Sequence, residues 1–253
     1  MFRIGLRMSL AYRSQVFWSV VALIAQVFLL RMIWTSMYGT RPAAGGLTLE
    51  ALLAYLTLVN LQVFAMTPGV SRIAHFRIRT GTVFFDLARP VGYLWQMALW
   101  QAGNSWGGVL LMAPAIPVVL LVGSVVAPSA LWAYVVTLAL GYVIGVMLAL
   151  LVCLIGFWMM ETGAISMLYR LVSQFFAGTM VPLTFFSGWL GWLADALPFK
   201  YLGYVPAAIY VGRVTGPEIL KAVIVEVVWV VALYGVLWLT WTRAHRRVVI
   251  QGG

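Results

Sequence analysis

Apolar residues form long runs along this chain, and the charged residues lie in short segments between those runs. The longest uncharged run covers 90–160 and contains no Asp, Glu, Lys, Arg or His. A helix rises about 1.5 Å per residue, so about 20 residues cross the hydrocarbon layer of a membrane. The run is therefore too long for one crossing and fits two, with a turn near Gly123, Pro128 and Ser129.

The same reading of the whole chain predicts six membrane-spanning helices and no separate soluble domain. Composition agrees, because 64% of the residues are hydrophobic and 9% are charged, which is more apolar than the core of a soluble domain requires. We therefore expect an all-α integral membrane protein in which residues 1–253 form a single transmembrane domain. The six predicted spans cover 16–34, 52–70, 93–122, 130–158, 171–190 and 220–241.

The arginines and lysines indicate which side of the membrane each segment faces, because short cytoplasmic segments collect these residues. If the N-terminus is inside, eleven of the 16 basic residues fall on the inner side and five on the outer side. The sequence thus predicts both termini in the cytoplasm, in a multi-pass protein of the cell's inner or plasma membrane. It predicts no nucleic-acid binding, because the net charge of +10 is spread over membrane-flanking segments and is not gathered on a soluble surface.

Several kinds of chemistry are missing from the sequence. There is no G-x-x-x-x-G-K-[ST] phosphate loop, and both lysines, Lys200 and Lys221, fall on the predicted outer side. There is no H-E-x-x-H motif or Cys/His cluster, and the single cysteine, Cys153, lies within the fourth predicted span. We therefore predict no catalytic residue, no metal or cofactor site and no ATPase activity in this chain.

The first 15 residues are basic and partly amphipathic. Polar and apolar side chains fall along separate sides of a helix: Arg3, Arg7 and Ser14 on one, Phe2, Leu6 and Leu10 on the other. This pattern is typical of a helix that lies in the inner interface of the membrane. A simple positively charged anchor is an equally good interpretation.

The inner loop between the second and third spans, 71–92, is longer than a simple connection requires. It predicts a short helix over 82–88, with a glycine before it and a proline after it. Phe84 and Leu87 would share one face of this helix and Asp86 another. Such a helix could dock its apolar side chains into a groove of a cytosolic partner. The alternative is a charged loop that packs against lipid head groups.

Residues 191–219, between the fifth and sixth spans, are too apolar for a free outer loop, and Pro198 and Pro206 exclude one straight helix. Short re-entrant helices, which enter the outer leaflet and return, satisfy both constraints if neighbouring helices cover their backbone polar groups. An interfacial belt of aromatic residues is compatible with this arrangement.

Two segments resemble a known family. The inner loop reads IRTGTVFFDLARPVGYLW, and the later region reads VPLTFFSGWL...LPFKYLGYVPAAIYVG. Together with six N-in spans, these segments resemble the ABC-2 type transporter permeases. The closest likeness is to a compact subfamily whose inner loop follows I-R-x-G-x-[small/apolar]-[aromatic]-x-x-L-x-R-P. One departure is Asp86-Leu87-Ala88, where a fully apolar leucine pair is commoner.

The resemblance implies a division of labour between chains. The permease would pair with a second permease subunit, identical or related, and with two cytosolic ATPase subunits that bind ATP and Mg. The inner loop would be the coupling helix that receives the movement of the ATPases. Its residues are Arg77, Arg79, Gly81, Phe84, Phe85, Asp86, Leu87 and Arg89. The outer re-entrant helices would close the exit of the transport path.

The resemblance also implies that the path runs between two permease subunits, along the first, second and fifth spans. Polar side chains within a membrane are costly unless they face protein or water, so they mark candidate path residues. These are Gln26, Asn60, Gln62, Gln174 and Thr179, with Met180 among the apolar candidates. Walls rich in Met and aromatic residues suit a hydrophobic or amphipathic small molecule, and we expect it to be exported.

Other polar residues in the spans have structural interpretations. We expect Gln101, Asn104 and Ser105 of the third span to form hydrogen bonds between helices. Glu226 lies near the outer end of the sixth span. An ion pair between Glu226 and a nearby cation, Arg213 or Lys200, is favoured over a proton relay.

Two other functions are compatible with parts of the pattern. A membrane-embedded enzyme that processes lipids could use the inner arginines to hold phosphate head groups, but it needs a cluster of carboxylates or histidines that is not evident in the sequence. A non-transporting membrane scaffold could recruit a cytosolic protein through the same inner loop. Transport differs from the scaffold in predicting that ATP hydrolysis by the partner depends on cargo.

Overall fold

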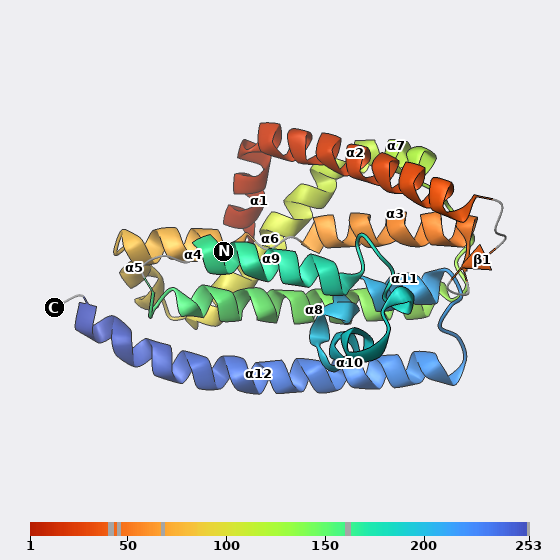
Figure 1. Cartoon of the computed structure of the whole chain (residues 1–253). Helices are drawn as coiled ribbons and strands as arrows, with labels where there is room; N and C mark the ends of the chain where they lie inside the picture. The colour runs from red at the N-terminus through yellow and green to blue at the C-terminus, as the bar shows by residue number, and fades with distance from the viewer. Residues whose placement is uncertain (40–42, 45–46, 67–68, 160–162, 252–253) are drawn as a thin grey trace.

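The structure is a computed structural model that describes residues 1–39, 43–44, 47–66, 69–159 and 163–251, and within these ranges it is mainly helical (Figure 1). The helices are α1 (Phe2–Ala11), α2 (Arg13–Tyr38), α3 (Leu49–Met66), α4 (Val70–Arg79), α5 (Val83–Leu87), α6 (Tyr93–Met112), α7 (Ile116–Val122), α8 (Leu131–Ile155), α9 (Gly163–Ala177), α10 (Gly188–Ala196), α11 (Tyr204–Tyr210) and α12 (Pro217–Gln251). Short 3₁₀ helices are η1 (Ala113–Ala115), η2 (Leu183–Phe185) and η3 (Pro198–Leu202). A two-stranded antiparallel ribbon pairs β1 (Ala43–Ala44) with β2 (Leu47–Thr48).

Five stretches of the described chain are long and apolar enough to cross a membrane. They are Arg13–Tyr38, Leu49–Arg79, Tyr93–Val122, Leu131–Ile155 and Pro217–Ala244, and the second of them includes the two undescribed residues between α3 and α4. These stretches coincide with five of the six predicted spans. They agree with the prediction of an all-α membrane protein.

The bounds predicted for the fifth span, 171–190, are wrong. Helix α9 has 15 residues and ends at Ala177, so it is about 22 Å long. Gly178 follows with a φ of 78°, a left-handed conformation that ends the helix and that glycine adopts without steric cost. Pro182 lies four residues further on, and the chain then continues into η2 and α10. The apolar composition of 171–190 is therefore shared between a short helix and an irregular segment.

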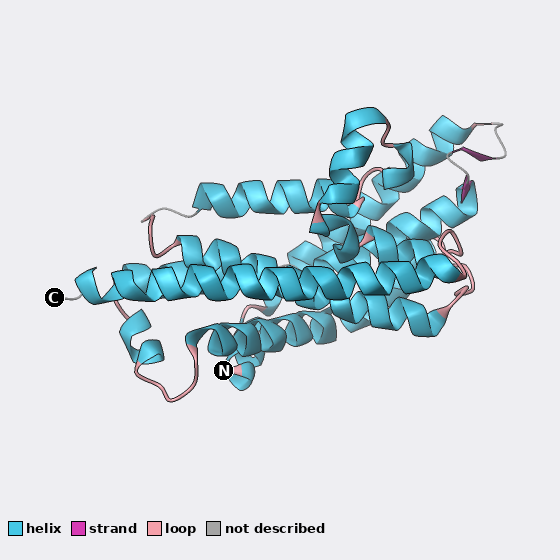
Figure 2. Cartoon of the chain, turned by 90° about the horizontal axis from the view of Figure 1, so that it is seen from below, coloured by secondary structure: helices cyan, strands magenta, loops and turns pink. Residues whose placement is uncertain are grey.

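The long helices define two ends of the molecule. The C-terminus and the ribbon of β1 and β2 lie at opposite ends in both views (Figures 1 and 2). Helix α5 lies at the end that holds the C-terminus, and we call this the α5 end. Helices α10 and α11 lie in the half of the molecule nearer the ribbon, and we call that end the β1 end (Figure 1).

Helix α8 lies at the centre of the helix packing and contacts α3, α4, α6, α9, α11, α12 and η3. Its small residues permit close approach. A Cβ atom at Gly141 would overlap the carbonyl oxygen of Tyr201, so the backbone of η3 packs directly on α8. Toward the α5 end, the Tyr93 ring of α6 stacks on Trp241 of α12, with 5.2 Å between ring centroids, in a cluster that also contains Phe157. This cluster joins α6, α12 and the segment that follows α8.

Helix α1 lies across the long helices and packs on α6 (Figure 1). Its buried residues are Gly5 and Ser9, and a Cβ atom at Gly103 of α6 would overlap the carbonyl oxygen of Phe2. Gly103 and Gly107 have the G-x-x-x-G spacing that allows two helix backbones to approach closely. The predicted N-terminal helix is therefore present, but its small residues form the buried face and Phe2 is exposed.

Candidate functional site

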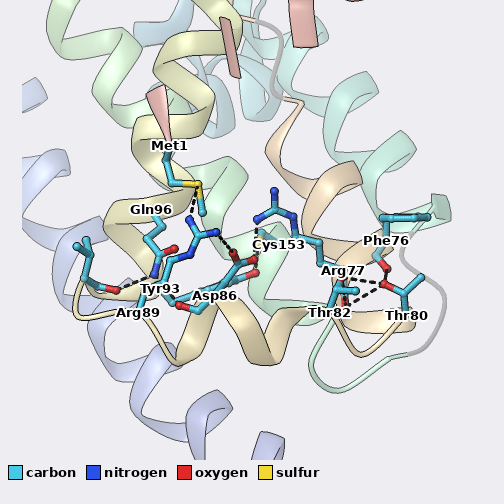
Figure 3. A network of polar contacts seen from close by, with 11 residues as sticks. Met1, Phe76, Arg77, Thr80, Thr82, Asp86, Arg89, Tyr93, Gln96 and Cys153 are labelled. Carbon is cyan, nitrogen blue, oxygen red and sulfur yellow. Dashed lines mark hydrogen bonds and ion pairs between the residues drawn. The ribbon is translucent and has the colours of Figure 1, made fainter. Parts of the chain in front are cut away.

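At the α5 end, Asp86 holds helix α5 against its neighbours (Figure 3). Its carboxylate accepts a hydrogen bond of 2.6 Å from Arg77 of α4 and lies 4.0 Å from the guanidinium of Arg89. The Asp86 side chain is 4% exposed, so its charge is balanced within the protein. Gln96 of α6 donates hydrogen bonds of 2.7 Å to the carbonyl oxygens of Asp86 and Val91. Helix α5 is therefore fastened to both α4 and α6.

Helix α5 turns two aromatic side chains away from the protein. Phe84 and Phe85 are each 68% exposed, and their rings form an edge-to-face pair with 6.2 Å between centroids. Val83 and Leu87, one turn apart, pack inward against the cluster that contains Tyr93. The expectation that Phe84 and Leu87 share one face is therefore wrong, because Leu87 continues the core and leaves Phe84 and Phe85 as the outward pair.

The turn before α5 requires its glycine. Gly81 has a φ of 70°, and the hydroxyl groups of Thr80 and Thr82 form a hydrogen bond of 2.9 Å across it. Arg79 precedes this turn and lines, together with His75, a cavity of about 450 Å³ at the α5 end. The I-R-x-G part of the loop thus sets the direction in which the chain enters α5.

A larger cavity, of about 860 Å³, lies between α1, α2, α3, α4, α6 and α9, and we call it the central cavity. Four of the six candidate path residues line it: Gln26, Asn60, Gln174 and Thr179. Its wall also contains apolar side chains and two arginines, namely Leu23, Val63, Phe64, Trp100, Arg72 and Arg170. The fold therefore brings into one cavity residues from three separate predicted spans.

Hydrogen bonds connect three of these path residues. The Gln26 side-chain amide donates to the Oδ1 atom of Asn60 at 2.9 Å. The Nδ2 atom of Asn60 donates to the carbonyl oxygens of Thr179, at 2.9 Å, and of Leu56, at 2.8 Å. Asn60 is 4% exposed. The wall of the central cavity therefore joins α2, α3 and the segment that follows α9.

The other two candidate path residues, Gln62 and Met180, lie away from the central cavity. Gln62 faces α8, where its side-chain amide donates a hydrogen bond of 3.1 Å to the hydroxyl of Tyr134. The Met180 side chain is 56% exposed, and its carbonyl oxygen accepts a hydrogen bond of 3.3 Å from the indole of Trp34. The two residues therefore contribute to packing between elements in this chain.

Among the polar residues of α6, Gln101 bonds to α4, whereas Asn104 and Ser105 line the central cavity. The Oε1 atom of Gln101 accepts hydrogen bonds of 2.9 and 3.0 Å from the backbone N–H groups of Gly69 and Val70, at the start of α4. This confirms the prediction of bonds between helices for Gln101. Asn104 and Ser105 line the central cavity, which the sequence analysis did not predict.

The sequence analysis also missed most of the face that α2 presents to the central cavity. Gln15, Ser19, Ala22 and Gln26 line it and lie four, three and four residues apart. This spacing places them along one side of a helix. The polar spacing of Gln15, Ser19 and Gln26 is present in the sequence, but it is a weak signal because Ala22 interrupts the series.

The expected ion pair of Glu226 is wrong. Glu226 is fully buried in α12, and neither carboxylate oxygen has a hydrogen-bond partner among the described residues. Lys200, one of the two expected partners, instead pairs with Asp195 at 2.7 Å. Asp195 lies close to Lys200 in sequence and its side chain is 76% exposed, so Lys200 gains a partner without the cost of burying a carboxylate.

The described chain thus combines apolar helices of membrane-spanning length, a polar-lined cavity among them and a fastened helix that exposes two aromatic side chains at one end. These features are those of a multi-pass, mainly helical membrane protein. Residues 20–252 match the family model described as ABC-2 family transporter protein, so the chain belongs to the ABC-2 transporter family. Membership makes it a membrane permease of an ABC transporter and implies association with ABC ATPase subunits. No curated protein matches the chain significantly.

Proposed function

We propose that this chain is the permease subunit of an ABC exporter, with six crossings and both termini in the cytoplasm. Helix α9 and the irregular segment that follows it would form the fifth crossing, since they lead toward the half of the molecule that holds α10 and α11 (Figure 1). Arg72, Arg77, Arg79 and Arg89 lie on α4 and around α5. This concentration of positive charge supports the assignment of the α5 end to the cytoplasm of the cell's inner or plasma membrane.

Helix α5 is the proposed coupling helix, which receives the movement of two cytosolic ATPase subunits. The observation that supports this assignment is the contrast between the two sides of α5. Asp86 and Leu87 fasten it to the protein, while Phe84 and Phe85 project from the α5 end. Exposed aromatic side chains on a fixed element are suited to fill a groove in a partner, because docking then costs little conformational entropy of the side chains and the backbone.

The central cavity is proposed to lie on the transport path, between this chain and a second permease subunit that is identical or related. Its apolar wall and its amide groups suit a hydrophobic or amphipathic small molecule that also forms hydrogen bonds. Helices α10 and α11 would be the re-entrant helices that close the exit at the β1 end. ATP and Mg would be bound by the partner chains, and the energy would reach the cavity through α4 and α5.

Affinity purification of this chain from its native membrane, in a mild detergent, tests the proposal. We expect an ABC ATPase subunit to co-purify, together with a permease subunit that is either a second copy or a related chain. The complex should hydrolyse ATP faster when the cargo is present. ATP hydrolysis that is independent of every amphipathic compound tested would favour a non-transporting scaffold, and recovery of the chain without any ATPase would contradict the proposal.

A further inference from the structure

The central cavity carries positive charge that no described residue balances with an ion pair. Arg72 of α4 and Arg170 of α9 are the charged residues of its described lining, and no carboxylate occurs in that lining. Neither guanidinium forms an ion pair with a residue that the structure describes. Arginine at the inner side of a membrane protein is common. What the positive-inside tendency does not account for is that two arginines from distant segments face the same cavity.

Two other arginines, Arg77 and Arg31, show how an arginine is used where the protein supplies an acceptor. Arg77 pairs with the Asp86 carboxylate at 2.6 Å. Arg31 donates hydrogen bonds to the carbonyl oxygens of Val122 and Gly123, at 2.7 and 3.0 Å, and so caps the end of α7. These two arginines thus stabilise the fold by donating hydrogen bonds to acceptors within the protein. Those at the central cavity are left to interact with water or with a bound group.

Each of the two arginines has an uncharged residue of the cavity lining one turn further along its own helix. Arg170 lies one turn from Gln174 on α9, and Arg72 lies one turn from Phe76 on α4, and all four residues line the cavity. Each arginine is therefore followed along its helix by the kind of side chain that contacts a neutral part of a ligand, an amide in one case and an aromatic ring in the other. The remaining wall includes apolar side chains such as Leu23, Val63 and Phe64.

We propose that the central cavity binds an amphipathic molecule with an anionic head group, a carboxylate or a phosphate. Arg72 and Arg170 would hold the head group, because guanidinium groups form paired, charge-assisted hydrogen bonds with these anions. The apolar wall would contact the tail, and the amides of Gln26 and Gln174 would bind polar groups between the two. This inference names the cargo class of the exporter proposed above and therefore rests on that proposal.

A cysteine-protection assay on the full chain in nanodiscs tests the inference without any ATPase. The buried native cysteine is first removed by Cys153→Ala. Ser19→Cys then places a single reactive thiol on the wall of the central cavity. The rate of modification by N-ethylmaleimide is measured in phosphatidylcholine nanodiscs. Dodecyl phosphate is added below its critical micelle concentration, and dodecyltrimethylammonium, with the same tail and the opposite charge, is the matched probe.

We expect dodecyl phosphate to slow modification and dodecyltrimethylammonium to have little effect. In the Arg72→Gln/Arg170→Gln variant the dodecyl phosphate concentration that gives half protection should rise at least about ten-fold, which corresponds to about 1.4 kcal/mol. Arg72→Lys/Arg170→Lys keeps the charge and should retain part of the protection, which shows that the cavity remains folded. Arg79→Gln, an arginine outside the central cavity, should behave as the parent.

Equal protection by both probes, protection that survives Arg72→Gln/Arg170→Gln, or no protection at all would overturn the inference. Nanodiscs that contain phosphatidylglycerol distinguish the source of the anion. Slower modification in those nanodiscs, without any added probe, would assign the site to the head group of a membrane lipid. Equal rates in the two lipids would assign it to a single-chain amphiphile. Failure of this assay would leave the permease assignment intact, because ATPase co-purification is measured independently.

Discussion

The side-chain amide of Asn60 donates a hydrogen bond of 2.9 Å to the carbonyl oxygen of Thr179, and so joins α3 to the irregular segment after α9. The carbonyl groups on either side of Thr179 are bound in the same way. Tyr55 donates to the Gly178 carbonyl at 3.1 Å, and Trp34 donates to the Met180 carbonyl at 3.3 Å. Three consecutive carbonyl groups are thus satisfied by side chains of α2 and α3. This arrangement allows an interrupted helix to exist among apolar surroundings, where an unpaired carbonyl is costly.

Asn60→Leu should loosen this segment. The substitution leaves the Thr179 carbonyl and the Gln26 amide without their partner, which should cost about 1–3 kcal/mol of stability. Hydrogen exchange by mass spectrometry should show faster exchange of the backbone amides of 178–181. Gln62→Leu is the matched control, because Gln62 lies nearby on α3 but bonds to Tyr134 of α8. Unchanged exchange of 178–181 in the Asn60 variant would show that the segment is held by packing alone.

Gly103→Ala should displace α1 from α6. The new methyl group would overlap the carbonyl oxygen of Phe2, which belongs to the backbone and cannot move aside alone. In a Cys153→Ala background, a cysteine placed at the buried position Ser9 should then react faster with a maleimide. Gly108→Ala adds the same methyl group to the same helix where nothing lies within 4 Å, so it should leave that rate unchanged. Equal rates in the two glycine variants would indicate that α1 is not held through the glycine face.

Phe84→Ala/Phe85→Ala should weaken docking of the ATPase subunit while the permease remains inserted. The pair is exposed, so its removal creates no cavity, but it removes the aromatic anchors that interfaces commonly depend on. Co-purification of the ATPase should fall by roughly ten-fold or more, the factor that a loss of about 1.4 kcal/mol produces. Phe17→Ala/Trp18→Ala removes a comparable exposed edge-to-face pair from α2 and should retain the ATPase. Normal recovery and normal ATP hydrolysis with the α5 variant would exclude the coupling role.

Asp86→Ala should release α5 from its fastening. Arg77 would be left 17% exposed without its anion, and removing one member of a largely buried pair costs about 3 kcal/mol. We expect a lower thermal unfolding temperature and faster cleavage of the 80–90 loop by a protease. Asp195→Ala is the matched control, because it removes an ion pair of similar length and leaves a cation, Lys200, of similar exposure (16%). Since the Asp195 carboxylate is itself 76% exposed and the Asp86 carboxylate only 4%, water already screens this pair, and the loss should be smaller than for Asp86→Ala. Similar unfolding temperatures for the two variants would mean that α5 is held by its apolar contacts.

Glu226→Leu should raise stability. The carboxylate is buried without a hydrogen-bond partner in the described structure, so its removal breaks no hydrogen bond and relieves the cost of its burial. Thermal unfolding of the purified chain measures this directly, and Glu226→Gln, which removes the charge but keeps the shape, should give an intermediate or neutral result. A clear loss of stability in both variants would contradict the prediction and would mean that the Glu226 carboxyl group makes a favourable interaction in the folded chain.

The local features of the site follow from sequence where a single residue type imposes the geometry. Gly81, with its positive φ, and the proline that follows the loop bound the short helix α5 close to where it was predicted. The end of α9 is a similar case. Gly178 and Pro182 mark this end in the sequence. The residues around them are apolar, however, so hydropathy alone predicts a span that continues to residue 190.

The direction in which side chains face was less predictable. Asn60 and Gln62 are two residues apart on α3, which places them on different sides of a helix, and sequence provides no means to decide which side meets the central cavity. The contact between α1 and the rest of the protein was not predictable either, because the amphipathic pattern of Phe2, Leu6 and Leu10 indicates only which side would face the membrane. The buried side of α1 consists of Gly5 and Ser9, since the glycines of α6 allow backbone contact.

The sequence by itself determined the class of this protein: apolar runs long enough to cross a membrane, basic segments between them and a short helix bounded by glycine and proline. These are properties of composition and local conformation, and they need no knowledge of which helices are neighbours. Only the tertiary structure decided that Arg72, Arg170, Gln26 and Asn60 share one cavity and that Glu226 has no hydrogen-bond partner among the described residues. The reason is physical. Which helices pack together depends on the shapes of whole faces, and residues far apart in the sequence meet only once that packing is complete.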